Sequence, residues 1–221
     1  MTSPTNTNTN TATITAAATE VDVRELLDRA IVIGGHAIAS VRPEQLALPT
    51  PCTEMDVRAL LGHLVGVLDR IAALGRDDDL FAIGDGESPD DRWIDVWNAA
   101  ADSAVDAWSD DATLGRPMAL PWVQGLGGEL LASYLPELTV HTWDLAVATG
   151  QQPEWDDAVL KTALVSSDYL PAENRLALFE EISANMGLDE VAVPFAEAIE
   201  MPANAPAIDR LVAWNGRDPR R

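Results

Sequence analysis

The chain has 221 residues, enough for one domain with a full hydrophobic core and a short appended region. It carries 36 acidic side chains against 14 basic ones, a formal net charge of −22, so its surface repels phosphate backbones and anionic lipid headgroups. These numbers exclude nucleic acid and membranes as expected partners.

The single cysteine, Cys52, cannot form an internal disulfide, and the N-terminus lacks the basic start and apolar run of a signal peptide. No apolar stretch approaches the roughly 20 residues needed to cross a bilayer. We therefore expect a cytoplasmic protein. The sequence leaves open whether it is a monomer or a homodimer.

The first half of the chain predicts a tail and two helices. Residues 1–19 alternate Thr and Asn with almost no large apolar side chains, which predicts a disordered tail. Apolar residues then recur at helical spacing over residues 21–41, until a proline ends the run. A second helix is predicted from about Thr53, as its N-cap, to Leu74. Its apolar stripe consists of Leu60, Leu61, Leu64, Val67, Leu68 and Ile71.

Two further helices complete the pattern of a bundle. An acidic, turn-rich loop precedes a third helix that starts near Asp90. A fourth helix is predicted from about Glu129 to Thr149, with Gly150 as a left-handed C-cap and a kink at Pro136. The aromatic inner face of the third helix consists of Trp93, Val96, Trp97, Ala100, Ala104 and Trp108.

The domain organisation follows from these elements. We expect an all-α protein: a disordered tail (1–19), a four-helix bundle without β-sheet (20–150) and a smaller helical extension packed on the bundle (151–221). Within the extension, helices are predicted at about 154–170, 173–186 and 206–214, with an irregular stretch over 191–206.

Three histidines, His36, His63 and His141, are the scarcest chemically informative residues of the chain. His63 borders the apolar stripe of the second helix, and Glu137 lies four residues before His141, so the two share one face of the fourth helix. Two imidazoles and one carboxylate are a donor set found at zinc sites with an open fourth position.

Simpler interpretations stand beside this one. A histidine at the edge of a stripe is more often a satisfied core residue than a ligand, and Glu and His four residues apart can form a surface pair. Asp144 extends the face of Glu137 and His141, either to orient a metal-bound histidine or as a surface acid. His36 is expected on the surface.

The neighbours of this face also have two interpretations each. Tyr134 and Trp143 either wall a pocket or pack in the core. Cys52 lies before the second helix, whose N-terminus could favour its thiolate, or it is a small buried cap residue.

Three strings of the sequence carry a family resemblance. TPCTEMDVRALLGHLVG (50–66), ELTVHTWDLAVATG (137–150) and IDRLVAWNGRDP (208–219) resemble the actinobacterial branch of the mycothiol-dependent maleylpyruvate isomerase N-terminal-domain family. That family is part of the DinB-like superfamily of four-helix bundles. The resemblance covers most of residues 20–219.

The resemblance implies a divalent metal, usually zinc and sometimes nickel, held by His63, Glu137 and His141. It also implies a low-molecular-weight thiol such as mycothiol, activated by the metal for transfer to, or isomerisation of, a small-molecule substrate. The leading hypothesis is therefore a metal-dependent thiol transferase or isomerase. The alternatives are a non-catalytic metal- or small-molecule-binding protein and a helical interaction module.

Overall fold

The computed structural model describes residues 12–13, 21–120, 123–186 and 195–220. In chain order its elements are β1 (Ala12–Thr13), α1 (Val23–Ala39), the 3-10 helix η1 (Pro43–Gln45), α2 (Val57–Arg76), the 3-10 helix η2 (Leu80–Ala82), α3 (Trp93–Ala107), α4 (Asp111–Gly115), β2 (Pro117–Ala119), β3 (Val123–Leu126), α5 (Gly127–Ala132), α6 (Tyr134–Thr149), α7 (Asp157–Ser166), α8 (Arg175–Met186) and α9 (Ala207–Trp214).

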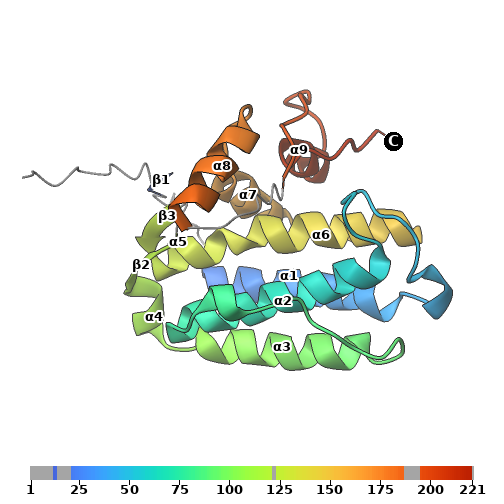
Figure 1. Cartoon of the computed structure of the whole chain (residues 1–221), viewed down its shortest axis with the longest axis horizontal. Coiled ribbons are helices and arrows are strands. Elements are labelled where there is room, and N and C mark those ends of the chain that lie inside the picture. The colour runs from blue at the N-terminus through green and yellow to red at the C-terminus, as the bar shows by residue number, and fades with distance from the viewer. Residues whose placement is uncertain (1–11, 14–20, 121–122, 187–194, 221) are drawn as a thin grey trace, which may run out of the picture.

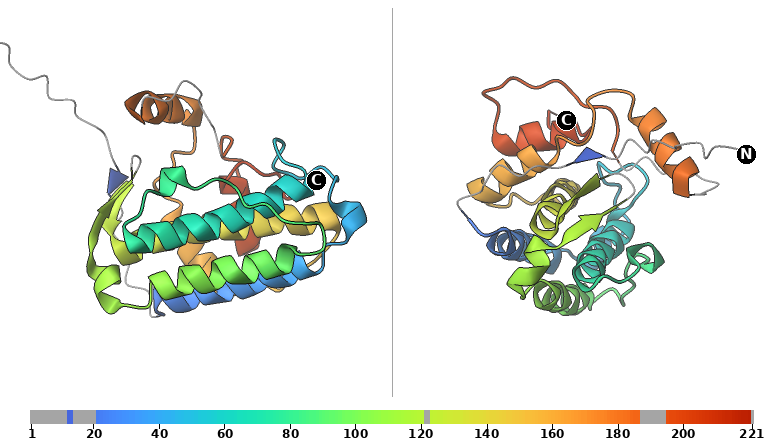
Figure 2. Two further views of the ribbon diagram at one scale, coloured as in Figure 1. Left: turned by 60° about the horizontal axis from the view of Figure 1, so that its bottom comes forward. Right: turned by 90° about the vertical axis from the view of Figure 1, so that its left-hand side faces the viewer.

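Four long helices, α1, α2, α3 and α6, form the bundle (Figures 1 and 2). Each packs against two others, since α2 contacts α3 and α6, and α1 contacts the same two helices. The core lies between them and contains every residue of the stripe predicted on α2, together with Trp97 and Trp108. The indole of Trp108 donates to the carbonyl of Ile71 on α2 at 2.8 Å. The predicted all-α four-helix bundle is confirmed.

Two predicted helix starts are corrected. α2 begins at Val57 rather than near Thr53, because Asp56 is its N-cap and accepts a hydrogen bond from the backbone N–H of Ala59 at 2.9 Å. α3 begins at Trp93 rather than near Asp90, whose carboxylate instead pairs with Arg58 on α2.

The predicted fourth helix is two helices, α5 and α6, interrupted at Ser133. Pro136 is the third residue of α6, within the first turn, where no intrahelical N–H donor is needed. The helix is therefore interrupted just ahead of Pro136, and Glu137 lies in the first turn of α6. The predicted C-cap is confirmed: Gly150 has φ 73°.

A small sheet contradicts the prediction that residues 20–150 contain no β-structure. β3 pairs antiparallel with β2 and parallel with β1, in the order β1-β3-β2. Pairing is possible because the glycine-containing segment before α5 folds back on β2, with Gly125 opposite Met118. Two residues of the predicted disordered tail, 12–13, thus belong to a strand. The rest of that tail lies outside the described residues.

The C-terminal region packs on one side of the bundle. α7 contacts α6 and α1, and α9 contacts α7 and α6. The buried guanidinium of Arg175 ties this region together by donating to the carbonyls of Pro171, Ala196 and Trp214 at 2.7, 2.6 and 2.7 Å. Of the stretch predicted to be irregular, 195–206 contains neither helix nor strand, and 191–194 lies outside the described residues. Within the described ranges, no helix has both the length and the apolar character to span a membrane.

Candidate metal centre

His63 on α2 and the pair Glu137 and His141 on α6 meet where these two helices pack together. Both imidazoles direct Nε2 at the same carboxylate oxygen: Glu137 Oε1 lies 3.1 Å from His63 Nε2 and 3.6 Å from His141 Nε2. The two rings stand edge to face, with centroids 4.7 Å apart. The three side chains singled out in the sequence therefore form one cluster.

A loop that crosses α2 holds the outer nitrogen of His63. Asp85 Oδ1 lies 3.3 Å from His63 Nδ1 and accepts a hydrogen bond from Arg70 at 2.9 Å. Asp85 was not singled out in the sequence, because it lies in an acidic, turn-rich loop. The signal that could have revealed it is the pair Gly62 and Gly66, whose spacing leaves one face of α2 without side chains.

Glycines on α2 let the loop approach closely enough for this contact. The N–H of Gly86 donates to the carbonyl of Gly62 at 2.8 Å. A Cβ at position 62 would lie 2.5 Å from the carbonyl oxygen of Gly86, and one at position 66 would lie 2.7 Å from that of Gly84. Only glycine leaves room for backbone against backbone here, so the sequence of α2 fixes where Asp85 lies.

A second carboxylate holds the outer nitrogen of His141. Asp144 Oδ2 lies 3.1 Å from His141 Nδ1, and the same carboxylate accepts a hydrogen bond from Arg217 at 3.0 Å. Asp144 is fully buried, and His141 is 2% exposed. Each histidine thus has a carboxylate at Nδ1 and presents Nε2 to Glu137, the arrangement by which proteins fix the orientation of metal-binding histidines.

The cluster is strongly coupled electrostatically. Burial opposes a charge on His63, but its hydrogen bonds to Asp85 and Glu137 outweigh that cost and raise its pKa to about 9. The hydrogen bond to His63 leads the causes that lower the pKa of Asp85 to about 2. Burial would raise the pKa of Glu137, yet the neighbouring imidazoles of His141 and His63 hold that pKa well below its usual range. Glu137 is therefore an anionic donor.

The donor set fits a divalent metal. Two ligands at roughly 2.1 Å from a tetrahedral zinc ion are about 3.4 Å apart, close to the 3.1 and 3.6 Å that separate Glu137 Oε1 from the two Nε2 atoms. All three ligand atoms lie within 4.8 Å of one another. Small side-chain movements are enough to bring them around one ion.

Cys52 forms a second group with His141 and Asp144 whose ligand atoms also lie within 4.8 Å of one another. This group is the poorer metal site, because Asp144 is already bonded to Arg217 and to His141 Nδ1. Burial is the main cause that raises the pKa of the Cys52 thiol. The idea that the N-terminus of α2 stabilises a Cys52 thiolate is therefore not supported.

Two phenols lie near Glu137. Burial first, and then the charge of Glu137, raises the pKa of both Tyr134 and Tyr169, so each keeps its proton and remains a hydrogen-bond donor. Tyr169 was not singled out in the sequence, since it follows α7 and reaches the site only through the tertiary fold. Trp143 and Tyr134 are partly buried and pack against the core.

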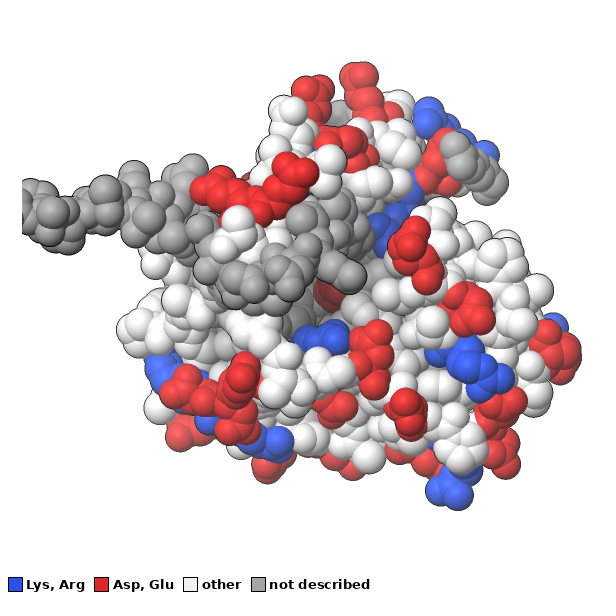
Figure 3. Space-filling view, in the orientation of Figure 1, with Lys and Arg blue, Asp and Glu red and all other residues white. Residues whose placement is uncertain are grey.

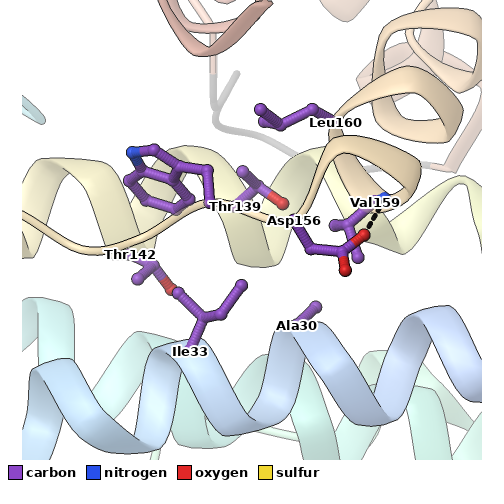
Figure 4. A pocket seen from close by; sticks show the side chains of 8 residues that line it. Ala30, Ile33, Thr139, Thr142, Asp156, Val159 and Leu160 are labelled. Atoms are coloured by element: carbon purple, nitrogen blue, oxygen red, sulfur yellow. Dashed lines mark hydrogen bonds between the residues drawn. The ribbon is translucent and has the colours of Figure 1, made fainter.

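A cavity on another side of α6 is too small for a substrate (Figure 4). It lies between α1, α6 and α7 and has a volume of about 10 Å³, room for one water. Thr139 lines it and is roughly 160° around the helix from Glu137 and from His141. The cavity is therefore separate from the candidate centre. His36 is exposed, as predicted.

The surface carries the acidic excess of the composition. Figure 3 shows Asp and Glu side chains spread over the visible face, with fewer Lys and Arg among them. The Nε2 atoms and the Glu137 oxygen of the candidate centre are thus presented by a strongly negative protein, which attracts cations to its surface.

The fold and the cluster define a helical-bundle protein with a candidate His–Glu–His metal centre. A family model described as the mycothiol maleylpyruvate isomerase N-terminal domain matches residues 27–146, more than half of the chain. The chain belongs to this family, as its motifs predicted.

Curated relatives match a larger part of the chain. An uncharacterized protein of Mycobacterium tuberculosis strain CDC 1551 / Oshkosh is 28% identical over 185 residues, which cover 83% of this chain and 91% of that protein. An uncharacterized protein of Mycobacterium tuberculosis strain H37Rv matches with the same identity and coverage. No solved structure matches the chain.

Proposed function

We propose that this protein binds one divalent metal ion, zinc or nickel, through His63, Glu137 and His141, and that it is a metal-dependent low-molecular-weight-thiol transferase or isomerase. The observation that carries the proposal is the convergence of both Nε2 atoms on Glu137 Oε1, at 3.1 and 3.6 Å. Family membership supports a thiol of the mycothiol type and a small-molecule substrate.

The ligand geometry would leave one coordination position of the metal open. Asp85 and Asp144 occupy the two Nδ1 atoms, which leaves Nε2 of each ring as the donor. Three protein ligands leave one tetrahedral position for an exogenous group. Bound metal would supply Lewis acidity, which lowers the pKa of a thiol and favours its thiolate at neutral pH. Tyr134 and Tyr169 keep their protons and can donate to a substrate oxygen nearby.

The non-catalytic alternative requires a closed site with a fourth protein ligand, for which Asp144, beside His141, is the obvious candidate. Its carboxylate is engaged by His141 Nδ1 and by Arg217, which speaks against that arrangement. We place the activity in the cytoplasm, where low-molecular-weight thiols are kept reduced.

Metal analysis and titration test the first part of the proposal. The protein is purified without added metal for elemental analysis, and the metal-free form is titrated with zinc and with nickel. His63→Ala, Glu137→Gln and His141→Ala are each expected to lose more than the roughly 100-fold in affinity that loss of an outer partner costs. His36→Ala is the matched control, because His36 is an exposed histidine of α1. Wild-type affinity in Glu137→Gln would remove Glu137 from the site.

Cobalt-substituted protein tests the second part. Adding mycothiol or another low-molecular-weight thiol is expected to produce thiolate-to-metal charge-transfer absorption, and an S-methylated thiol is expected to produce none. A metal-binding protein that gives no such absorption with any thiol would favour the non-catalytic alternative.

A further inference from the structure

The backbone that follows α9 is fixed in a turn that returns the chain toward the bundle. The N–H of Gly216 donates to Ala213 at 3.0 Å, and the N–H of Arg217 donates to Val212 at 2.9 Å. This pair of bonds is the Schellman arrangement of a helix C-terminus. Gly216 has φ 79°, and a Cβ there would lie 2.7 Å from the Cβ of Ala196, so glycine is required on both counts. The turn therefore directs Arg217 inward.

Arg217 meets Asp144 in the protein interior. Its Nη2 lies 3.0 Å from Asp144 Oδ2, and its Nε lies 3.3 Å from each carboxylate oxygen. Arg217 is 6% exposed and Asp144 is 0% exposed. Arg217 therefore donates paired hydrogen bonds to a carboxylate that has no contact with solvent.

The same carboxylate oxygen connects Arg217 to the candidate centre. Asp144 Oδ2 accepts from Arg217 and lies 3.1 Å from His141 Nδ1. With the Nδ1 proton donated to Asp144, His141 keeps the lone pair of Nε2 free for a metal ion held beside Glu137.

The phenyl ring of Phe195 packs on one face of the His141 imidazole. It stacks on His141 with ring centroids 6.1 Å apart and planes 25° apart. The guanidinium carbon of Arg217 lies 5.2 Å from the centroid of that phenyl ring. Phe195 and Arg217 both lie beyond residues 27–146, the part matched by the family model.

We propose that Arg217 is a positioning residue of the centre: by holding the Asp144 carboxylate in place, it fixes the tautomer and orientation of His141. The C-terminal region thereby completes a site whose donors all lie in the bundle. The effect on metal affinity rests on the proposed function, whereas the effect on the imidazole does not.

The test uses the full chain and a double-mutant cycle. Arg217→Met keeps much of the side-chain length without the charge, Arg217→Lys keeps the charge without the paired donors, and Asp144→Asn removes the anion. Arg220→Met is the matched control, because Arg220 is an exposed arginine that bonds only to Asp218 among the described residues. Two quantities are measured: zinc affinity, and the ring ¹⁵N shifts of His141 in the metal-free protein, which report its tautomer.

Arg217→Met is expected to weaken zinc binding about 10–100-fold and to give mixed His141 tautomers, with partial recovery in Arg217→Lys. Because Arg217 acts through Asp144, adding Arg217→Met to Asp144→Asn is expected to change zinc affinity less than about twofold further. Fully additive losses, or a wild-type tautomer and affinity in Arg217→Met, would overturn the proposal. If Arg217→Met does not fold, the comparison of Asp144→Asn with the neutral double variant still decides it.

Absence of zinc binding in the wild type would overturn the proposed function alone. In that case the ¹⁵N shifts of His141 in the same variants decide the role of Arg217. Unchanged shifts in both Arg217→Met and Arg217→Lys would then reject it.

Discussion

Replacement of Gly62 by alanine tests whether the loop that carries Asp85 is fixed by backbone contact with α2. The new Cβ would lie 2.5 Å from the carbonyl oxygen of Gly86, so the loop must move by about 1 Å to restore an ordinary contact. That movement strains the 2.8 Å hydrogen bond from Gly86 to Gly62. The substitution thus acts on the loop rather than on the helix.

The expected change in stability follows from three opposing contributions. Alanine in a helix interior stabilises by about 1 kcal/mol relative to glycine. Overpacking costs about 1–3 kcal/mol, and the weakened hydrogen bond costs about 1 kcal/mol. The free energy of unfolding of Gly62→Ala should therefore fall by about 1–3 kcal/mol, measured by denaturant unfolding of the metal-free protein.

Gly128→Ala is the control for this experiment, because a Cβ at that position of α5 has its nearest neighbours at 3.7 Å. It should be as stable as the wild type or slightly more so. Gly62→Ala should also bind zinc about tenfold or more weakly, since the moved loop carries Asp85 away from His63. Wild-type stability together with wild-type zinc affinity in Gly62→Ala would refute the close contact between loop and helix.

Four further predictions concern the centre, the stability of the metal-free fold and the core. Asp85→Asn should weaken zinc binding about 10–100-fold and lower the pKa of His63 from about 9, which calorimetry and NMR titration would detect. In the wild type, zinc must displace a proton from His63, so affinity should fall about tenfold per pH unit below pH 9; constant affinity between pH 7 and 9 would contradict this. Because the pKa of His63 is raised from 6.5 to about 9 in the folded protein, protonated His63 adds to the free energy of unfolding of the metal-free protein. This contribution is complete below pH 6.5 and is lost as the pH rises through about 9. Trp108→Phe leaves the carbonyl of Ile71 without its indole donor, so the free energy of unfolding should fall by about 1–3 kcal/mol while zinc affinity stays unchanged.

The parts predicted from sequence are those that depend on local periodicity. The stripe on α2 specified which face is buried, and the four-residue spacing of Glu137 and His141 placed both on one face of α6. The interruption of the helix ahead of Pro136 is in keeping with the missing N–H of proline, which is also a local property.

The parts that escaped prediction depend on where distant segments meet. Asp85 looked like a solvated acid, because its contact with His63 arises only from the path of the loop over α2. Arg217 reaches Asp144 across 73 residues of sequence. Strands of two to four residues carry too little alternation to be read from the pattern, so the sheet was missed.

The distance in sequence between Asp144 and Arg217 has a consequence for biosynthesis. Arg217 follows Asp144 by 73 residues, which a ribosome adds in roughly 4–15 s. During that interval the nascent chain already contains all three donors of the candidate centre but lacks the guanidinium that neutralises Asp144. Burial of Asp144 in its final, fully hydrogen-bonded setting must therefore wait for Arg217. The ion pair between Asp144 and Arg217 can form only after residue 217 has been synthesised.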